Sequence, residues 1–219
     1  MTETWDFLQS PAASAAFNMA LDESLLRTAA KRGRPLVRVY SWERPAVTFG
    51  YFQKFPKDLA NGSEIIRRPT GGGVVYHGDD TTYTVVVPPA HAFLMMATLD
   101  AYTLLHKAVA AVFDSQPSLH VAEPHSPHGQ YECFQKPVHG DVVADGRKLA
   151  GGAQRRTKSG MLHQGSIAAK LSARQLKQGF QGTLGIDFAA YELTEAEQTL
   201  AEKLTAEKYA TDTWNRYLR

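Results

Sequence analysis

Two side chains of this sequence have the types and the spacing for covalent acyl chemistry. Cys133 is the single cysteine of the chain and follows a polar stretch, and Lys148 comes shortly after it, just before small and apolar residues at 149–152. Cysteine attacks as the thiolate, which a nearby positive charge stabilises. A lysine in apolar surroundings is poorly hydrated, so its electrostatic interactions are strong. The pair predicts a cysteine nucleophile supported by an ammonium group.

Both residues also have a simpler interpretation. A lone cysteine is most often a small buried apolar side chain, inert in chemistry. Lys148 lies just beyond the Asp145-Gly146 pair, where a solvated hairpin lysine is common. The sequence leaves these alternatives open.

Three consecutive glycines, Gly71 to Gly73, follow two arginines and lead into an apolar pair. Glycine has no Cβ, so this backbone can bend sharply and lie against a ligand. Arg67 and Arg68 add fixed positive charge. Neither a Walker loop nor a dinucleotide fingerprint fits, because no Gly-Lys-Ser/Thr and no helix-opening third glycine follows. The run predicts a site for an anionic or acyl ligand; a flexible turn between strands is the alternative.

The histidines indicate no metal site. His120, His125, His128 and His139 match no zinc spacing and have no cysteine pair beside them, so we expect no metal. His77 follows the glycine run and His163 lies in Leu162-His163-Gln164-Gly165, so each is either a pocket residue or a structural hydrogen-bonding residue.

Strands must position most of these residues. Asp145-Gly146 predicts a type I′ turn in a hairpin over residues 141–150. Residues 74–76 and 82–87 read as a second, hairpin-like pair around residues 77–80. The β-branched and aromatic content predicts further strands at residues 36–40, 46–52, 64–68 and 161–167.

Helices fill the remaining segments. Apolar residues at helical spacing predict a helix over residues 12–31, which begins with a cap at Ser10 and turns Asp22 and Glu23 outward. The same spacing predicts one long helix over residues 92–113. Further helices are expected at residues 56–59, 172–178 and 194–209, the last with a Thr194/Glu197 capping box.

Composition narrows the class of protein. The 219 residues are 43% hydrophobic and 21% charged, which is typical of a globular protein with a sizeable core. A net charge of +2 is too small to indicate nucleic-acid binding. One cysteine favours a reducing compartment. We find no signal peptide and no apolar run of membrane-spanning length, so we expect a cytoplasmic protein without membrane contact.

Several ordered motifs together resemble the lipoate-protein ligase A and octanoyltransferase group. They are Arg67 to His77, Gly146-Arg147-Lys148-Leu149-Ala150-Gly151-Gly152-Ala153-Gln154, residues 162–167, residues 18–22 and residues 47–53. The resemblance covers roughly residues 5–190. It implies an α+β fold, the biotin/lipoate protein ligase catalytic domain, with mixed sheets flanked by helices. We expect residues 1–219 to form this one domain, without a C-terminal accessory domain.

Within this group, Cys133-Phe134 ahead of Lys148 looks like the LipM-like octanoyltransferases. The resemblance implies transfer of an octanoyl or lipoyl group from acyl carrier protein, through a thioester on Cys133, to a lysine of a lipoyl domain. The catalytic residues are then Cys133 and Lys148. The implied substrate-binding residues are Arg67, Arg68, Thr70, Gly71, Gly72, Gly73, Val74, Val75, Tyr76, His77, Gly151, Gly152, Ala153, His163 and Gly165.

Two other activities fit the same group. One is an ATP-dependent lipoate-protein ligase, in which Lys148 would hold the acyl-adenylate and ATP with Mg would be required. The other is a lipoate-binding subunit without catalysis.

Transfer itself would need no cofactor. Its acceptor would be the lipoyl domain of a 2-oxoacid dehydrogenase E2 component or the glycine cleavage H protein. Chain length of the acyl group, acceptor identity and oligomeric state are left open by the sequence.

Overall fold

Strands that are buried along most of their length build one large mixed sheet. The computed structural model describes residues 2–59, 63–113, 120–121 and 137–216. The large sheet has the strand order β11-β1-β2-β6-β10-β9-β8-β7. Its strands are β1 (Glu3–Gln9), β2 (Leu36–Tyr40), β6 (Thr81–Val87), β7 (His120–Val121), β8 (Val142–Ala144), β9 (Arg147–Thr157), β10 (Gly160–Ile167) and β11 (Ile186–Ala190).

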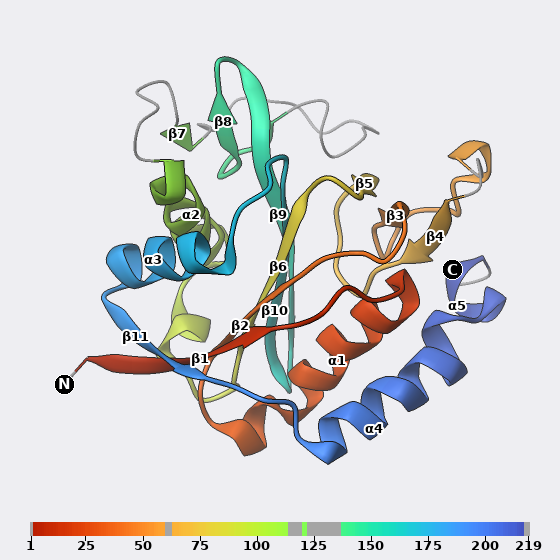
Figure 1. Cartoon of the computed structure of the whole chain (residues 1–219), viewed down its shortest axis with the longest axis horizontal. Coiled ribbons are helices and arrows are strands. Elements are labelled where there is room, and N and C mark those ends of the chain that lie inside the picture. Colours follow the sequence, from red (N-terminus) through yellow and green to blue (C-terminus); the bar gives the residue numbers. More distant parts are fainter. Residues whose placement is uncertain (1, 60–62, 114–119, 122–136, 217–219) are drawn as a thin grey trace.

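Helices cover both faces of this sheet, because successive strand residues point to opposite sides. Val85 and Val87 pack with Leu105 on one face, under α2 and α3, whereas Val86 packs with Leu25 on the other, under α1 and α4. Figure 1 shows the two helix pairs on either side of the strands. The helices are α1 (Ala15–Arg32), α2 (Thr98–Ala110), α3 (Ala173–Leu184), α4 (Glu195–Leu204) and α5 (Asp212–Asn215).

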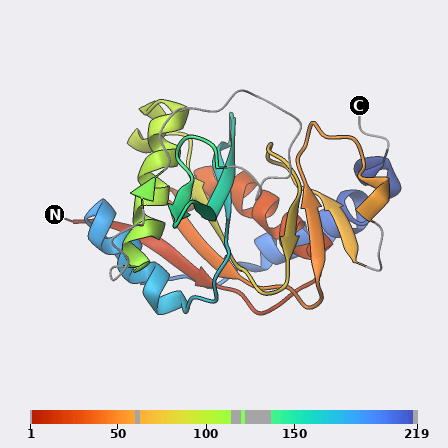
Figure 2. The same cartoon turned by 90° about the horizontal axis from the view of Figure 1, so that it is seen from above.

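A second sheet of three strands, in the order β4-β3-β5, stands beside the large one (Figure 2). The C-terminal helix α5 contacts β4 on the outer side of this small sheet. Its strands are β3 (Ala46–Phe49), β4 (Glu64–Arg67) and β5 (Val75–His77), and short helical turns cover η1 (Lys57–Leu59), η2 (Ala92–Met95), η3 (Ala111–Phe113) and η4 (Thr205–Tyr209).

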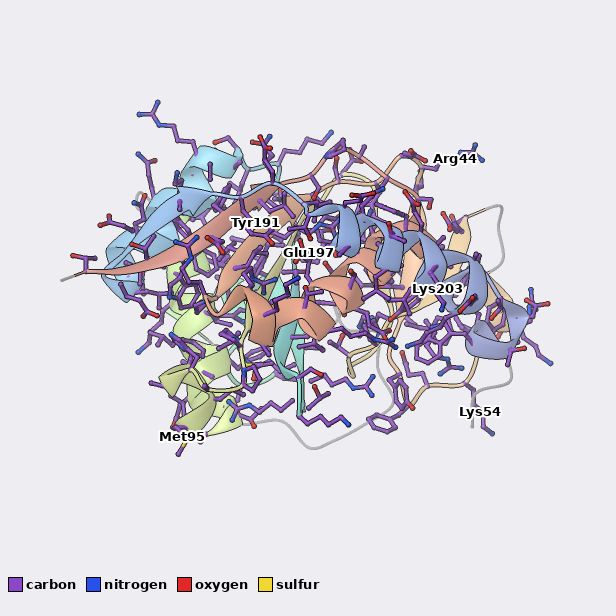
Figure 3. All side chains as sticks on the ribbon, turned by 90° about the horizontal axis from the view of Figure 1, so that it is seen from below. Arg44, Lys54, Met95, Tyr191, Glu197 and Lys203 are labelled. Carbon is purple, nitrogen blue, oxygen red and sulfur yellow. The ribbon has the colours of Figure 1, made fainter. Side chains whose placement is uncertain are left out.

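Helix α4 is tied to its neighbours by the buried Glu197. The Glu197 carboxylate accepts hydrogen bonds from Tyr191, Thr28 and Thr194, the last within the expected capping box. Figure 3 shows Tyr191 and Glu197 together at the start of α4, with Lys203 farther along the helix. The predicted capping box is confirmed.

The predicted hairpin is also confirmed. Strands β8 and β9 pair antiparallel around Asp145 and Gly146, whose φ angles of 49° and 74° are those of a type I′ turn. The mixed sheets flanked by helices confirm the expected α+β class.

The helix expected over residues 12–31 differs in two respects. Its N-cap is Ser14 and not Ser10, because the chain up to Gln9 forms β1. Asp22 and Glu23 are buried and do not turn outward. Burial is tolerated because each carboxylate has partners: Arg38 donates to Asp22, and Tyr209 donates to Glu23.

Two further expectations were wrong. Strands β5 and β6 do not pair as a hairpin, since β5 joins the small sheet through β3 and β6 joins the large sheet. The helix over residues 92–113 is interrupted, because Met96 and Ala97 are extended, with ψ near 150°. Strands β1 and β11, which pair in parallel at one edge, were not anticipated.

In the part of the chain that the structure describes, every helix is too short or too polar to cross a membrane.

Candidate active site

A cavity with about 430 Å³ of empty space, part of it open to solvent, lies between the large sheet, the small sheet and helix α1. The lining residues are Met19, Tyr40, Trp42, Thr48, Arg68, Val75, His77, Thr82, Lys148, Gly151, Gly152, Ala153, Gln164, Gly165 and Ser166.

One row of side chains across four strands forms much of the cavity wall. Tyr40 pairs with Thr82, Thr82 with Ser166, and Ser166 with Gly151. Directly paired residues point to the same face of a sheet. The row therefore presents an aromatic ring and two hydroxyl groups, and it ends at a residue without a side chain.

Lys148 crosses the space that Gly151 leaves. A Cβ atom at position 151 would lie 2.2 Å from Cε and 2.4 Å from Nζ of Lys148. The lysine side chain is only 4% exposed, and its Nζ lies 2.7 Å from Oδ2 of Asp141. The backbone at Gly151 thus lets a buried ammonium group reach the cavity.

Asp141 is itself fixed from two sides. Its carboxylate is fully buried and accepts hydrogen bonds from the Tyr102 hydroxyl at 2.6 Å and from the Val138 amide at 2.8 Å. The Tyr102 hydroxyl in turn accepts from the amide of Gly152 at 3.0 Å. The lysine, its carboxylate and the cavity wall are therefore one connected network.

Arg68 shapes the glycine run. Its guanidinium donates to the carbonyl oxygens of Gly71 and Gly73 and, at 3.3 Å, to the Thr48 hydroxyl. Gly72 has a positive φ of 85°, and its carbonyl oxygen would lie 2.0 Å from a Cβ at Gly50. The glycines thus allow two backbone segments to touch, while the arginine holds the loop from within.

His77 forms the end of the cavity nearest the small sheet. Its ring stacks on Trp42 with centroids 4.1 Å apart. Nδ1 lies 2.7 Å from Asp80 and Nε2 lies 2.9 Å from the Thr48 hydroxyl. Burial lowers the pKa of His77, against the opposing effect of Asp80. A neutral ring that donates from Nδ1 to Asp80 and accepts from Thr48 satisfies all three groups.

With this geometry established, the sequence can be compared with known families. It matches the lipoyl protein ligase A/B catalytic domain over residues 14–209. That span contains every residue that lines the cavity. The chain belongs to this family.

The family's curated members include close counterparts of the whole chain. An octanoyltransferase LipM of Staphylococcus aureus is 29% identical over 274 aligned positions, which cover 98% of this chain and 99% of that protein. An octanoyltransferase LipM of Oceanobacillus iheyensis is 34% identical over 190 positions, which cover 83% of this chain and 70% of that protein.

Solved structures of the same fold are lipoate ligases. A bipartite lipoate protein ligase of Thermoplasma acidophilum has a TM-score of 0.77 and 24% identity, covering 100% of this chain and 98% of that one. A lipoate-protein ligase A bound with ATP has a TM-score of 0.76 and 24% identity, covering 100% of both chains. The TM-scores of these two structures show the shared fold.

In this family member, eight of the residues expected from the sequence line the cavity together. They come from the residue after β4, from β5 and from the paired strands β9 and β10, and they are Arg68, Val75, His77, Lys148, Gly151, Gly152, Ala153 and Gly165.

Arg67 lies apart from the cavity lining. Its guanidinium donates to the carbonyl oxygens of Trp214, Asn215, Tyr51 and Gln53. These hydrogen bonds hold the C-terminal segment against the chain after β3. Arg67 therefore has a structural role in this fold.

The other predicted binding residues between Thr70 and Tyr76 lie in different surroundings. Thr70 donates at 2.7 Å to the Oε1 atom of Gln164, which lines the cavity. Gly71 has open space where a Cβ would lie. The Gly72 carbonyl lies against Gly50, and the Gly73 carbonyl accepts a hydrogen bond from Arg68. Val74 is buried with the Val47 and Phe49 side chains, and Tyr76 is 52% exposed.

His163 lies behind the cavity wall, on the opposite face of β10 from Gln164. Its Nε2 is 3.0 Å from the Tyr83 hydroxyl, and its ring is 5.4 Å from that of His106. Burial holds the pKa of His163 well below its usual value, with a further lowering from His106. A Cβ at Gly152 would lie 2.7 Å from the His163 ring, so this histidine supports the wall.

Cys133 lies outside the described residues, as do His125 and His128. No three His, Cys, Asp or Glu side chains in the described ranges are grouped as metal ligands. The cavity's relation to the cysteine therefore rests on sequence alone.

Sequence reasoning missed a buried carboxylate beneath the cavity. Asp22 accepts hydrogen bonds from Arg38, Thr84 and Gln164, and Gln164 also accepts from Thr70. The polar residues at alternate positions of β2, β6 and β10 were the available signal, since they mark a buried face that needs polar partners. Met19, Tyr40, Trp42, Thr48, Thr82 and Ser166 were also not anticipated as cavity residues.

Proposed function

We propose that this protein is an acyltransferase of protein lipoylation that moves an octanoyl or lipoyl group to a lysine of a lipoyl domain. The observation that carries the proposal is the buried Lys148 amine at the cavity between the two sheets, in a chain of the lipoyl ligase A/B family. The octanoyltransferase names of the curated relatives support transfer over other activities of the fold.

The proposed reaction has two steps. The Cys133 thiolate attacks the thioester carbonyl of octanoyl-acyl carrier protein, so that a new thioester forms and the carrier thiolate leaves. The amine of the lipoyl-domain lysine then attacks the acyl-enzyme, which forms the amide, releases a proton and regenerates the cysteine thiolate. The Lys148 ammonium stabilises negative charge on the sulfur and on the carbonyl oxygen.

The cavity residues have matching roles in this proposal. The acyl chain lies among Met19, Tyr40, Trp42 and Val75, and the backbone of Gly151 and Gly152 faces the reacting carbonyl. No cofactor takes part in the transfer. Residues 1–219 act as one catalytic domain, in the cytoplasm. Acceptors are the lipoyl domains of 2-oxoacid dehydrogenase E2 components or the glycine cleavage H protein.

Mass spectrometry of the intact protein tests the first step. Incubation with octanoyl-acyl carrier protein is expected to add one octanoyl group, which hydroxylamine removes. Cys133→Ser is expected to abolish both this adduct and the appearance of octanoylated lipoyl domain. Full activity of Cys133→Ser would exclude the thioester route.

The same assay separates the alternatives. Transfer from the carrier protein is expected to proceed without ATP. Modification of the lipoyl domain from free lipoate, only when ATP and Mg are added, would identify a ligase. Tight lipoate binding without turnover of either donor would identify a binding subunit. Lys148→Ala is expected to lower the transfer rate by about 100-fold or more, as for other charge-stabilising groups.

A further inference from the structure

Asp141 lies at the centre of the network behind the cavity, although its residue type and position in the hairpin gave no sign of a role. It is fully buried, and it receives the Lys148 ammonium, the Tyr102 hydroxyl and the Val138 amide on its two oxygens. Tyr102 lies on α2 and Val138 lies before β8, whereas Lys148 lies on β9. The carboxylate is therefore held in place independently of the lysine.

The physical need for such a group follows from burial. A buried ammonium without a counter-charge is poorly solvated and tends to lose its proton. Lys148 is 4% exposed, and it must also share its surroundings with the positive charge of Arg68, another residue that lines the cavity. The Asp141 carboxylate at 2.7 Å supplies compensating negative charge.

Four other titratable groups of the described residues lie near the lysine and do not supply that charge. His77 lines the cavity from the small sheet, Tyr102 and His106 on α2 bond to Asp141 and to the carbonyl of Gly140, respectively, and His163 lies on β10 behind the cavity wall. Burial lowers the pKa of all three histidines and raises that of Tyr102 well above its usual value, so these four groups are uncharged near neutral pH.

We infer that Asp141 is the positioning residue of Lys148: its carboxylate compensates the charge of the buried ammonium group and holds it over Gly151 at the cavity. The catalytic meaning of this pairing rests on the proposed transferase function, whereas the pairing itself does not. The structural step that makes it possible is the tight Asp145-Gly146 turn, which returns β9 alongside the buried carboxylate.

NMR of protein labelled at the lysine ε-carbon tests the inference without an activity assay. The Lys148 signal is assigned by its disappearance in Lys148→Arg, and its shift is followed from pH 6 to pH 10. We expect Asp141→Asn, which is isosteric, to move the deprotonation midpoint of this signal to lower pH than in the wild type. Equal midpoints in the two proteins would overturn the inference.

Asp6→Asn is the matched control. Asp6, on β1 next to the edge strand β11, is also a fully buried carboxylate, and it pairs at 2.7 Å with Arg34. Its replacement should leave the Lys148 signal unchanged. If Asp141→Asn does not fold, the wild-type titration decides, because a Lys148 amine that is neutral at pH 8 in the wild type would overturn the inference.

The pH profile of transfer gives the second readout. Relative to wild type, Asp141→Asn should lose activity as pH rises, about tenfold for each unit above the midpoint seen by NMR. In the double variant Asp141→Asn with Lys148→Arg, this added alkaline loss should vanish, since a guanidinium stays protonated. An equal loss at all pH values would indicate a merely structural role. Absence of any transferase activity would refute the proposed function and leave the NMR result intact.

Discussion

At the scale of single residues, the site depends on two glycines, because neither has a Cβ atom. The Lys148 side chain passes where a Cβ of residue 151 would stand, and the carbonyl of Gly72 occupies the same kind of space at Gly50. Sequence reasoning identified the glycine-rich segments at residues 71–73 and 151–152 but assigned the space beside them to the ligand. The structure shows that much of it is filled by the protein's own lysine and backbone, which a glycine pattern alone cannot distinguish.

Gly151→Ala tests this reading. The added methyl group must displace the Lys148 amine, so we expect a loss of about 1–3 kcal/mol in the free energy of unfolding and about 100-fold in the transfer rate. Denaturant unfolding and the lipoyl-domain assay measure the two effects. In a Lys148→Ala background the same change should cost much less stability.

Gly182→Ala is the corresponding control, because open space surrounds that position within helix α3. The substitution should raise the free energy of unfolding by up to about 1 kcal/mol, because alanine favours the helix more than glycine does, and it should leave the transfer rate unchanged. If Gly151→Ala behaves like Gly182→Ala, the lysine does not lie where the structure has it.

At the scale of elements, the C-terminal helix α5 secures the strand that delivers the glycine run. The Asn215 side chain accepts from the Arg67 amide and donates to the carbonyl oxygens of Tyr209 and Thr211, while the Trp214 indole donates to the Arg67 carbonyl. These contacts join residues nearly 150 positions apart. A terminal segment without a marked pattern gives no hint of such a partner, so the sequence placed Arg67 in the binding site.

Asn215→Ala should therefore act on the site from a distance. It leaves buried backbone groups without partners, and we expect a loss of about 2–4 kcal/mol in unfolding free energy and a raised KM for the acyl donor. Urea denaturation and steady-state kinetics provide the measurements. Arg216→Ala, which breaks an exposed ion pair with Asp212, should stay within about 0.5 kcal/mol of wild type. Similar effects of the two variants would contradict this function of α5.

Elements with a strong local signal were predicted well, and elements defined by distant partners were not. The hairpin of β8 and β9 carries its own turn residues, so its conformation could be predicted from Asp145 and Gly146. Strand β5 follows β4 closely in sequence, yet both pair with β3, and that pairing is set by tertiary contacts. Strands β1 and β11 depend in the same way on a parallel partner at the opposite end of the chain.

At the scale of the whole molecule, buried histidines couple stability to pH. Burial lowers the pKa of His106 to about 4 and holds that of His163 well below its usual 6.5. The unfolded chain takes up these protons near pH 6.5 whereas the folded chain resists them, so the contribution of these two histidines to stability is fully present above about pH 7 and falls as pH decreases toward 4. The slope approaches about 1.4 kcal/mol per pH unit for each such histidine.

Urea unfolding at a series of pH values from 7.5 to 4.5 measures this coupling. His106→Gln should reduce the slope by about one proton, although it also lowers stability at pH 7.5 through its lost packing. His91→Gln, which alters a partly exposed histidine paired with Glu3, serves as the control and should leave the contribution of His106 in place. A slope unaffected by His106→Gln would show that other groups govern the acid response.

The cavity also joins the two halves of the polypeptide. Its walls are contributed by Met19 to Thr82 on one side and by Lys148 to Ser166 on the other, so any occupant touches both stretches of chain at once. Such an occupant binds the native state and has no equivalent site once the stretches separate. Loading with acyl donor should therefore register as resistance to global unfolding, by about 2.7 kcal/mol at a hundredfold excess over Kd. A rise in melting temperature can thus reveal bound acyl group even in variants that no longer turn over.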